Sequence, residues 1–297
     1  MHCKASVIIP TYNRNEDLIR AISSVLKQEF KEFELIIVDQ SINHDQITQR
    51  FLRNLKDKRF RYYKVTPPSL PAARNFGASK AIGEIIIFID DDVELKPNFI
   101  KEHVAAYSKS HQIGAVAGRI RGVTEEESNQ LFKISPSGKR TGSFNYPHDG
   151  EVMAVRGCNM SFRKDVLIEI GGFDSGFIKD AYREDTDASF RVRKAGYTIS
   201  YKSKADLIHF DAREGGCRDD SRLFNNLTTF KNNFRFFYKN QQMKDFPKFY
   251  LRHIYNVAPN PNPIIFAKRL YYLYRGSREA KNELMQNLPL IISKETS

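Results

Sequence analysis

Cysteine is scarce in this chain of 297 residues, which contains only Cys3, Cys158 and Cys217. Their number is odd, and no two of them form a Cys-x-x-Cys pair. Disulfide-stabilised domains and structural zinc sites depend on closely spaced, paired cysteines. The three residues therefore predict reduced thiols in a cytosolic protein, and neither a disulfide framework nor a zinc site.

Long hydrophobic runs are also absent from the chain. No apolar stretch approaches the roughly 20 residues that a membrane-spanning helix needs. The first apolar run, residues 5–10, is too short for a signal peptide and leads directly into a polar turn. We therefore expect neither a spanning helix nor a secretory leader, and the sequence shows no internal repeat.

What the chain does contain is an ordinary share of hydrophobic (41%) and charged (28%) residues, which indicates a folded soluble protein. Its length fits one α/β domain with an appendage. The net charge is +12, and residues 218–297 carry 14 Lys and Arg against 6 Asp and Glu, which is +8 of that total. This basic end predicts an anionic partner such as a phosphate-bearing substrate, a phospholipid surface or nucleic acid.

The first 120 residues alternate short, continuously apolar runs with helical patterns. The apolar runs predict strands at residues 6–10, 34–39, 61–65 and 85–89. Helical spacing predicts helices at residues 18–26, 47–55, 71–81 and from residue 97 onward. This order predicts an α/β fold with a doubly wound, mostly parallel, Rossmann-like sheet.

The second half of the chain has a weaker pattern. It predicts strands at residues 115–120, 152–155, 199–201 and 207–210, and helices at residues 164–170 and 186–195. Residues 125–150 are polar and rich in Gly, Ser and Pro, which predicts a loop that contributes to a pocket or a lid. Beyond Gly216 the pattern is helical, with breaks at Pro247 and within residues 259–263. We expect one domain over residues 1–216 and a helical appendage over residues 217–297.

Four aspartates are expected at the carboxyl ends of parallel strands, where such sheets bind ligands. They are Asp39, Asp90, Asp91 and Asp92. Carboxylates that converge repel one another unless a cation lies among them, and oxygen ligands favour Mg²⁺ or Mn²⁺. An ion there would stabilise a diphosphate leaving group, whereas the alternative is a solvated acidic turn.

Further polar residues accompany these aspartates. Pro10 and Thr11 follow the first strand and either line a base or phosphate pocket or belong to a plain helix cap. Arg74 near a helix start suits a phosphate, unless it is a surface arginine. Glu184 and Asp185 open a helix, where a carboxylate either accepts the proton of an attacking hydroxyl or only complements the helix dipole.

His209 follows an apolar strand. It is either a further metal ligand or a histidine whose hydrogen bonds are satisfied within the core or at the surface.

Five segments, taken in this order, resemble the family-2 glycosyltransferases, which have the GT-A fold. They read VIIPTYNR (residues 7–14), VDQS (38–41), AARNFGASKAIGEIIIFIDDDVE (72–94), GCNMSFRKDVLIEIGGFD (157–174) and REDTDASFRVRKAGY (183–197). The resemblance covers residues 6–216 and leaves out the C-terminal appendage.

The resemblance implies an inverting transfer of a sugar from a nucleotide-diphosphate donor to an acceptor hydroxyl, with Mn²⁺ or Mg²⁺ as cofactor. It assigns each candidate residue a role: Pro10, Thr11 and Asp39 at the nucleotide base, Arg74 near the ribose and diphosphate, Asp90 beside the donor, Asp91 on the ribose, Asp92 and His209 on the metal, Asp185 as general base and Glu184 beside it placing the acceptor.

Two features depart from the family pattern. Gln40 stands where a second acidic residue usually follows the position of Asp39, and the usual glycine is missing, which leaves base recognition open. The acidic triplet also leaves open whether both Asp90 and Asp92 contact the ion.

The appendage interleaves aromatic with basic residues. They are Phe230, Phe234, Phe237, Tyr238, Phe249, Tyr250, Tyr271, Tyr272 and Tyr274, with Lys231, Arg235, Lys239, Lys248, Arg252, Lys268, Arg269 and Arg275. This composition fits helices that pack aromatic side chains inward and equally fits an anionic membrane surface. Nucleic acid would also suit it, but none is expected beside a glycosyltransferase.

The expected function is therefore sugar transfer in the synthesis of a cell-surface polysaccharide or glycolipid, with a saccharide or lipid-linked acceptor. The expected location is cytoplasmic, with peripheral attachment to the inner face of the plasma membrane as an open possibility. One alternative is a non-catalytic binding protein that keeps the fold. A second is a sugar nucleotidyltransferase, which usually has a glycine-rich phosphate loop after the first strand, and that loop is absent here.

Overall fold

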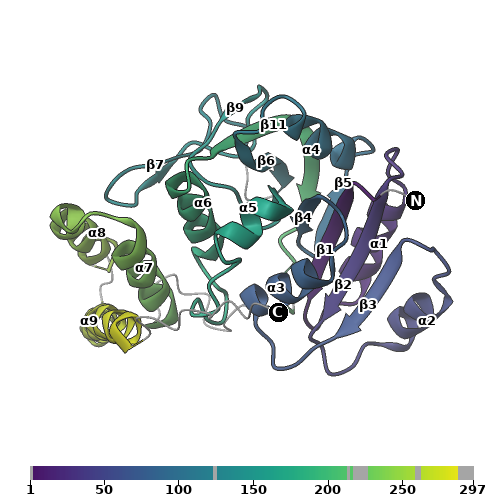
Figure 1. The fold of residues 1–297 in the computed structure, drawn as a ribbon. Coiled ribbons are helices and arrows are strands. Elements are labelled where there is room, and N and C mark those ends of the chain that lie inside the picture. Colours follow the sequence, from purple (N-terminus) through teal and green to yellow (C-terminus); the bar gives the residue numbers. More distant parts are fainter. Residues whose placement is uncertain (1–2, 123–125, 213–214, 217–226, 258–261, 287–297) are drawn as a thin grey trace, which may run out of the picture. The chain divides into compact units, whose positions relative to one another are not determined.

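The computed structural model describes residues 3–122, 126–212, 215–216, 227–257 and 262–286. The chain divides into two compact units, Met1–Asp219 and Asp220–Ser297. Figure 1 shows the strands of the first unit, with helices on both faces of its sheet, and the helices of the second unit.

The first unit contains a nine-stranded sheet within its described residues. Its strand order is β3 (Phe60–Lys64), β2 (Phe33–Asp39), β1 (Ala5–Thr11), β4 (Ile85–Ile89), β10 (Asn159–Arg163), β6 (Ile113–Gly122), β11 (Thr198–His209) and β5 (Val93–Leu95), and β9 (Gly150–Glu151) pairs with β11. Strands β1 to β4 pair in parallel, as do β6 and β11. Strand β10 is antiparallel to both of its neighbours, so the sheet is mostly parallel, as the sequence predicts.

The helices of this unit bury the faces of the sheet. They are α1 (Glu16–Leu26), α2 (Gln46–Asn54), α3 (Leu70–Lys80), α4 (Phe99–Tyr107), α5 (Lys164–Glu169) and α6 (Glu184–Lys194). Every residue of β1, β2 and β4 is buried, which explains their continuous apolar runs. Gly77 lets α3 approach the sheet, since a Cβ there would lie 2.5 Å from Cγ2 of Ile8.

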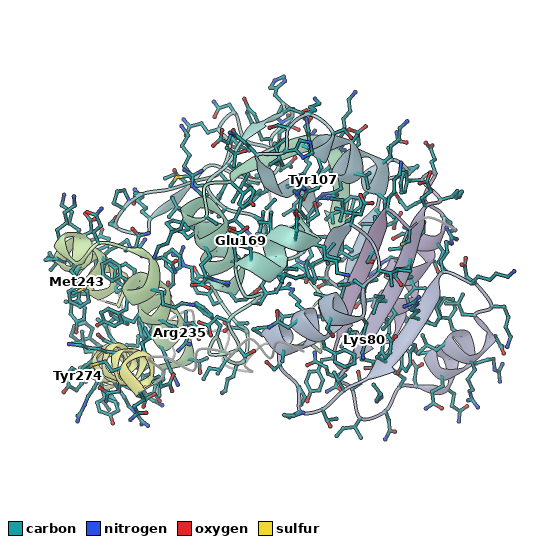
Figure 2. The ribbon with its side chains drawn as sticks, viewed as in Figure 1. Lys80, Tyr107, Glu169, Arg235, Met243 and Tyr274 are labelled. Carbon is teal, nitrogen blue, oxygen red and sulfur yellow. The ribbon has the colours of Figure 1, made fainter. Side chains whose placement is uncertain are left out.

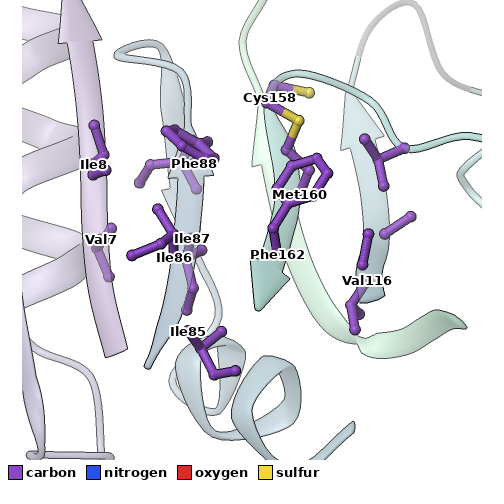
Figure 3. Packing of buried hydrophobic residues seen from close by; sticks show 14 of the residues in the cluster. Val7, Ile8, Ile85, Ile86, Ile87, Phe88, Val116, Cys158, Met160 and Phe162 are labelled. Atoms are coloured by element: carbon purple, nitrogen blue, oxygen red, sulfur yellow. The ribbon is translucent and has the colours of Figure 1, made fainter. Parts of the chain in front are cut away.

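The strand expected at residues 152–155 is wrong, because β9 ends at Glu151 and the next strand, β10, begins at Asn159. Figure 3 shows its apolar side chains, Met160 and Phe162, packed beside Phe88 of β4. The other face of β10 carries Asn159 and Ser161, which are buried and hydrogen-bonded. A search for continuous apolar runs misses a strand whose buried residues are half polar.

Two other expectations are modified by the structure. The two strands expected around residues 199–210 are one strand, β11, whose register shifts between Lys202 and Asp206. The predicted polar loop contains a short hairpin of β7 (Lys133–Ile134) and β8 (Arg140–Thr141), with Phe132 and Phe144 stacked in the core. This segment contains few apolar residues, so its composition does not indicate that it forms a hairpin.

The second unit consists of α7 (Leu227–Asn240), a 3₁₀ turn at Met243–Asp245, α8 (Phe246–Val257) and α9 (Pro263–Gln286). Its buried cluster contains Phe230, Phe234, Phe237, Phe249, Leu273 and Ala280. Pro247 is the second residue of α8 and so begins this helix, while the break expected at residues 259–263 lies partly outside the described residues. Among the described residues, no helix is both long and apolar enough to cross a membrane.

A buried polar network joins α4 to β10. The ring of His103 lies 2.9 Å from both Asn159 Oδ1 and Ser161 Oγ, and the hydroxyl of Tyr107, labelled in Figure 2, lies 2.8 Å from Ser161 Oγ. The amide of Asn159 donates to the carbonyl oxygens of Arg119 and Ala205, so its Oδ1 accepts a hydrogen bond from His103 Nε2. Burial lowers the pKa of His103 to about 4, so the ring is neutral at neutral pH and its Nδ1 accepts a hydrogen bond from Ser161 Oγ.

We predict that His103→Gln reduces the pH dependence of stability. The unfolded chain binds a proton on this histidine below about pH 6.5, whereas the folded chain does so only near pH 4, so wild-type stability falls as the pH is lowered through this window. The variant lacks this contribution, which is at most about 1.4 kcal/mol per pH unit. Urea unfolding between pH 7.5 and 4.5 measures it, with the exposed His111→Gln as control. Equal pH slopes for wild type and His103→Gln would contradict the assignment.

Candidate active site

Most of the predicted site residues lie at one edge of the sheet. Thr11 and Asp39 are aligned partners at the ends of β1 and β2. Asp90 directly follows β4, which is parallel to β1, and His209 ends β11. Because parallel strands end at the same edge, the doubly wound topology itself brings these side chains together.

Asp91 is almost fully buried behind this edge. Its Oδ2 accepts a hydrogen bond of 2.7 Å from the hydroxyl of Thr11. Burial raises the pKa of Asp91 to about 7, although the nearby Arg14 and the Thr11 hydroxyl act to lower it. A carboxylate held in this way favours a cation or a hydrogen-bond donor that completes its surroundings.

Asp92 and His209 face each other, with Asp92 Oδ1 3.2 Å from His209 Nε2. Burial acts to raise the pKa of Asp92, but the hydrogen bond and charge of His209 outweigh it and hold the pKa below its usual value. The same contact raises the pKa of His209 against the effect of its own burial. The backbone N–H of Ala212 donates to Asp92 Oδ2 at 3.0 Å, so the segment after β11 fixes this carboxylate.

Arg14 places a buried positive charge between the two carboxylates. Its guanidinium lies 3.9 Å from Asp91 and 3.5 Å from Asp92, and it donates to the carbonyl oxygen of Ala212 at 3.4 Å. Its side chain is only 4% exposed. Arg14 has no predicted role of its own beyond its place in the VIIPTYNR segment, and only its position after β1 indicates one in the sequence.

Arg74 joins the acidic triplet to the start of α6. Its guanidinium pairs with Glu184, lies 3.2 Å from Asp90 Oδ1 and donates to the carbonyl oxygen of Gly157 at 3.1 Å. The side chain is 1% exposed, so the surface-arginine alternative is wrong. The triplet and the Glu184–Asp185 pair therefore belong to one site.

Asp185 follows Glu184, the partner of Arg74, and is partly accessible to solvent. Its Oδ2 accepts a hydrogen bond of 3.0 Å from the backbone N–H of Gly157. The turn before α6 contains three non-glycine residues with positive φ: Lys179 (56°), Ala181 (49°) and Arg183 (81°). Such backbone persists only where surrounding contacts impose it, and here it orients the first turn of α6 toward the site.

Asp39 lies at the same edge, but internal donors surround its carboxylate. It accepts hydrogen bonds from Ser41 N (2.8 Å), His44 Nε2 (2.9 Å), Lys64 Nζ (3.0 Å) and the hydroxyl of Tyr62. Burial acts to raise its pKa, but the bonds from His44 and Tyr62 hold the pKa of Asp39 well below its usual range. Pro10 is buried within β1 beside Val38 of β2. Asp39 and Pro10 shape the edge of the sheet near Thr11.

The donor set at this edge fits a divalent cation. Asp92 and His209 offer an oxygen and a nitrogen 3.2 Å apart, and both are buried. Among the described residues, Glu184 Oε2 and Arg14 Nε are buried polar atoms without a hydrogen-bond partner. Clustered carboxylates and unpaired polar atoms are the features expected where a cation and an anionic ligand complete the site.

Cys158 is a further residue that sequence reasoning did not place at the site. One ligand atom each from Asp90, Cys158 and His209 lies within 4.8 Å of the others. The spacing of the cysteines along the chain cannot reveal this group, because its three residues lie on separate segments of the sequence.

The sequence model of glycosyl transferase family 2 matches residues 6–171, which is more than half of the chain. The chain therefore belongs to glycosyl transferase family 2, as the resemblance predicted.

The individual relatives differ in coverage. An uncharacterized glycosyltransferase of Rickettsia felis is 40% identical over 112 residues, which are 35% of this chain and 18% of the relative. Matches with three such Rickettsia proteins span only 16–20% of their lengths. The glucosyl-dolichyl phosphate glucuronosyltransferase of Haloferax volcanii is 26% identical over 220 residues, 69% of each chain.

Solved structures show the same architecture. GalNAc-T7, crystallised with UDP, GalNAc and Mn²⁺, has a TM-score of 0.69 at 17% identity, covering 97% of this chain and 58% of the other. Residues 1–349 of TarS from S. aureus, in complex with UDP-GlcNAc, have a TM-score of 0.57 at 15% identity, covering 95% and 92%. The predicted GT-A fold is thereby confirmed.

We predict that Arg14→Met destabilises the fold, because Asp91 and Asp92 lose a buried counter-charge. The expected loss is on the order of 3 kcal/mol, the scale for removing one partner of a buried ion pair. Urea unfolding in the presence of a chelator measures the loss, and Arg14→Lys should recover part of it. Arg50→Met, on the exposed side of α2, is the matched control. An Arg14→Met variant as stable as this control would show that Arg14 does not balance the carboxylates.

Proposed function

We propose that this chain is an inverting glycosyltransferase that moves a sugar from a nucleotide-diphosphate donor to an acceptor hydroxyl, with Mn²⁺ or Mg²⁺ as cofactor. The observation that carries the proposal is the contact of Arg74 with both Asp90 and Glu184, because it joins a donor edge to a potential base in one site. Residues 1–216 would form the catalytic domain and residues 217–297 an extension.

The donor would lie along the edge formed by β1, β2 and β4. Pro10, Thr11 and Asp39 would shape the pocket for the nucleotide base, with Asp39 acting through the side chains that surround it. Asp91 would accept from the ribose, and Arg74, beside Asp90, would contact the ribose and diphosphate.

Asp92 and His209 would hold the metal. When bound, the ion would neutralise charge that develops on the departing diphosphate. Arg14 already lies within 3.5 Å of Asp92, so this chain supplies a second positive charge to the same region.

Asp185 would remove the proton from the acceptor hydroxyl as that oxygen attacks the sugar. The hydrogen bond from Gly157 N fixes Oδ2 of Asp185, and Thr186 donates to Oδ1 through its backbone N–H and its hydroxyl. The partial exposure of Asp185 leaves room for an acceptor. Glu184, oriented by Arg74, would place the acceptor beside it. Attack on the face of the sugar opposite the leaving diphosphate would give inversion at the anomeric carbon.

The relatives support a saccharide or lipid-linked acceptor. Their names include a glucosyl-dolichyl phosphate glucuronosyltransferase and a Campylobacter jejuni glucosyltransferase acting on GalNAc(5)-diNAcBac-PP-undecaprenol. Others are a putative colanic acid glycosyl transferase of Escherichia coli and a poly(ribitol-phosphate) N-acetylglucosaminyltransferase of Staphylococcus aureus. We therefore place this chain in cell-surface polysaccharide or glycolipid synthesis.

We also propose that the second unit contacts an anionic membrane surface. Its phenylalanines form the internal cluster, as the packing alternative predicted, but helix α9 exposes a different set. Ile264, Tyr271 and Tyr274 are 54–77% exposed, and the basic Lys268, Arg275 and Arg278 are exposed on the same helix. Exposed apolar and basic side chains on one helix suit the boundary of an anionic bilayer.

We predict that Asp92→Asn abolishes the effect of metal on nucleotide binding. In the wild type, Mn²⁺ should strengthen binding of a nucleoside diphosphate by roughly tenfold or more, a difference of about 1.4 kcal/mol. Thermal shift and calorimetry with UDP and the other nucleoside diphosphates, each with and without Mn²⁺, measure this. Asp165→Asn, an exposed change of the same kind on α5, should behave as wild type. The enzyme proposal fails if the wild type binds no nucleoside diphosphate under any of these conditions.

We predict that Asp185→Asn removes catalysis while it preserves donor binding. Loss of a general base lowers the rate by roughly 10²–10⁴-fold. Metal-dependent hydrolysis of a panel of nucleotide sugars reports the rate without a known acceptor, and the nucleoside-diphosphate thermal shift reports binding. If Asp185→Asn hydrolyses donors at the wild-type rate, another group is the base.

For the membrane surface, we predict that the full chain co-sediments with vesicles containing phosphatidylglycerol. The triple variant Lys268→Glu, Arg275→Glu, Arg278→Glu should lose this binding, since each basic residue contributes about 1 kcal/mol near such a surface. Lys27→Glu, Lys56→Glu and Lys58→Glu together make the same change of charge on exposed lysines of the first unit and serve as control. Equal sedimentation of both triple variants would overturn the proposal.

A further inference from the structure

The group formed by Asp90, Cys158 and His209 follows from the sheet register. Strand β10 is antiparallel to β4, and Asn159 is aligned with Ile89. The residues one step beyond this pair, Cys158 and Asp90, therefore face each other across the edge of the sheet. His209 ends β11 and reaches the same place.

The chemistry of this group differs from that of an oxygen-rich magnesium or manganese site. It combines a thiol, an imidazole and a carboxylate, which together suit Zn²⁺ and Co²⁺ better than Mg²⁺ or Mn²⁺. Cys158 and His209 are buried, while the Asp90 side chain is 33% exposed and leaves a side open to solvent. A fourth ligand can therefore come from water.

The distances are compatible with one small ion. Tetrahedral coordination with bonds of about 2.0–2.3 Å separates the ligand atoms by roughly 3.5 Å. The three ligand atoms lie within 4.8 Å of one another. Side-chain rotations that move these atoms by about an ångström would bring them to the separation of a tetrahedral site. Asp90 keeps its contact with Arg74, which orients its carboxylate.

We infer that Asp90, Cys158 and His209 form a thiolate-containing site for Zn²⁺ or Co²⁺, which shares His209 with the Asp92–His209 pair but does not use Asp92. Binding breaks the S–H bond of Cys158, and its proton leaves to solvent as the metal–sulfur bond forms. The cysteine spacing argued against a zinc site, but spacing detects only ligands that are neighbours in sequence.

His209 is common to this group and to the contact with Asp92, so one imidazole serves two ligand sets. We expect an ion on Cys158 to compete with Asp92 for this imidazole. This consequence rests on the proposed function: Zn²⁺ should inhibit sugar transfer that depends on Mn²⁺.

Titration of the full-length chain with Co²⁺ tests the site without any activity measurement. A cobalt–thiolate bond gives a charge-transfer absorption band in the near ultraviolet, which oxygen and nitrogen ligands alone do not give. We expect this band in the wild type and in Cys3→Ser, and its loss in Cys158→Ser and His209→Ala. Added Zn²⁺ should remove it by displacing Co²⁺. Absence of the band from the wild type, or its persistence in Cys158→Ser, would overturn the site.

A second arm separates this site from the proposed function. Asp92→Asn should retain the cobalt–thiolate band, since Asp92 is not among the three ligands, while near-ultraviolet circular dichroism shows that each variant is folded. Loss of the band in folded Asp92→Asn would mean that the two ligand sets are one site.

The predicted inhibition by Zn²⁺ has its own measurement. The Zn²⁺ concentration that halves donor hydrolysis should rise at least tenfold in Cys158→Ser, each variant being compared with its own zinc-free rate. A chain that shows the band but hydrolyses no donor would keep the metal site and lose the proposed function.

Discussion

The buried guanidinium of Arg74 is the contact on which the site depends. It lies on α3, in the first half of the chain, yet its partners are Asp90 after β4, Glu184 at the start of α6 and the carbonyl of Gly157 before β10. An unpaired buried guanidinium would be strongly unfavourable, so these partners must assemble together. Arg74 thus couples correct folding of the second half of the domain to the edge formed by the first.

The balance of charge around this contact explains the rest of the geometry. Five carboxylates, Asp90, Asp91, Asp92, Glu184 and Asp185, lie near one edge, and Arg14 and Arg74 supply permanent positive charge among them. Burial raises the pKa of Asp91 to about 7, and the neighbouring carboxylates of Asp92 and Asp90 add smaller effects in the same direction. A cation bound among these carboxylates would stabilise the site, because it would reduce their mutual repulsion.

Much of this arrangement was accessible from the sequence. The continuous run IIIFI predicts a strand buried on both faces, and its end places Asp90, Asp91 and Asp92 at a ligand-binding edge. The family resemblance adds Arg74, Glu184, Asp185 and His209, which local patterns alone leave ambiguous. The alternation of strands and helices in the sequence predicts a parallel sheet. In such a sheet, residues that follow different strands lie close together at one edge.

Other features depend on contacts that no local pattern contains. Strand β10 buries Asn159 and Ser161 against His103, so its composition does not read as a core strand. Cys158 acquires its neighbours only through the register of β10 on β4. The four donors around Asp39 come from the loop after β2 and from strand β3, and the sequence shows the acidic residue but not the groups that surround it.

The central position of β10 also imposes an order on assembly. Strands β3, β2, β1 and β4 are neighbours in the sheet and pair in parallel. Residues 5–89 therefore contain the partner of β4 on one of its two edges. The other side of β4 meets β10, which is made only after β6 and the hairpin segment have been synthesised. Until then the most apolar strand of the chain presents an open edge, the kind of surface that pairs with other chains. During synthesis this edge is the part of the protein that most needs protection from self-association.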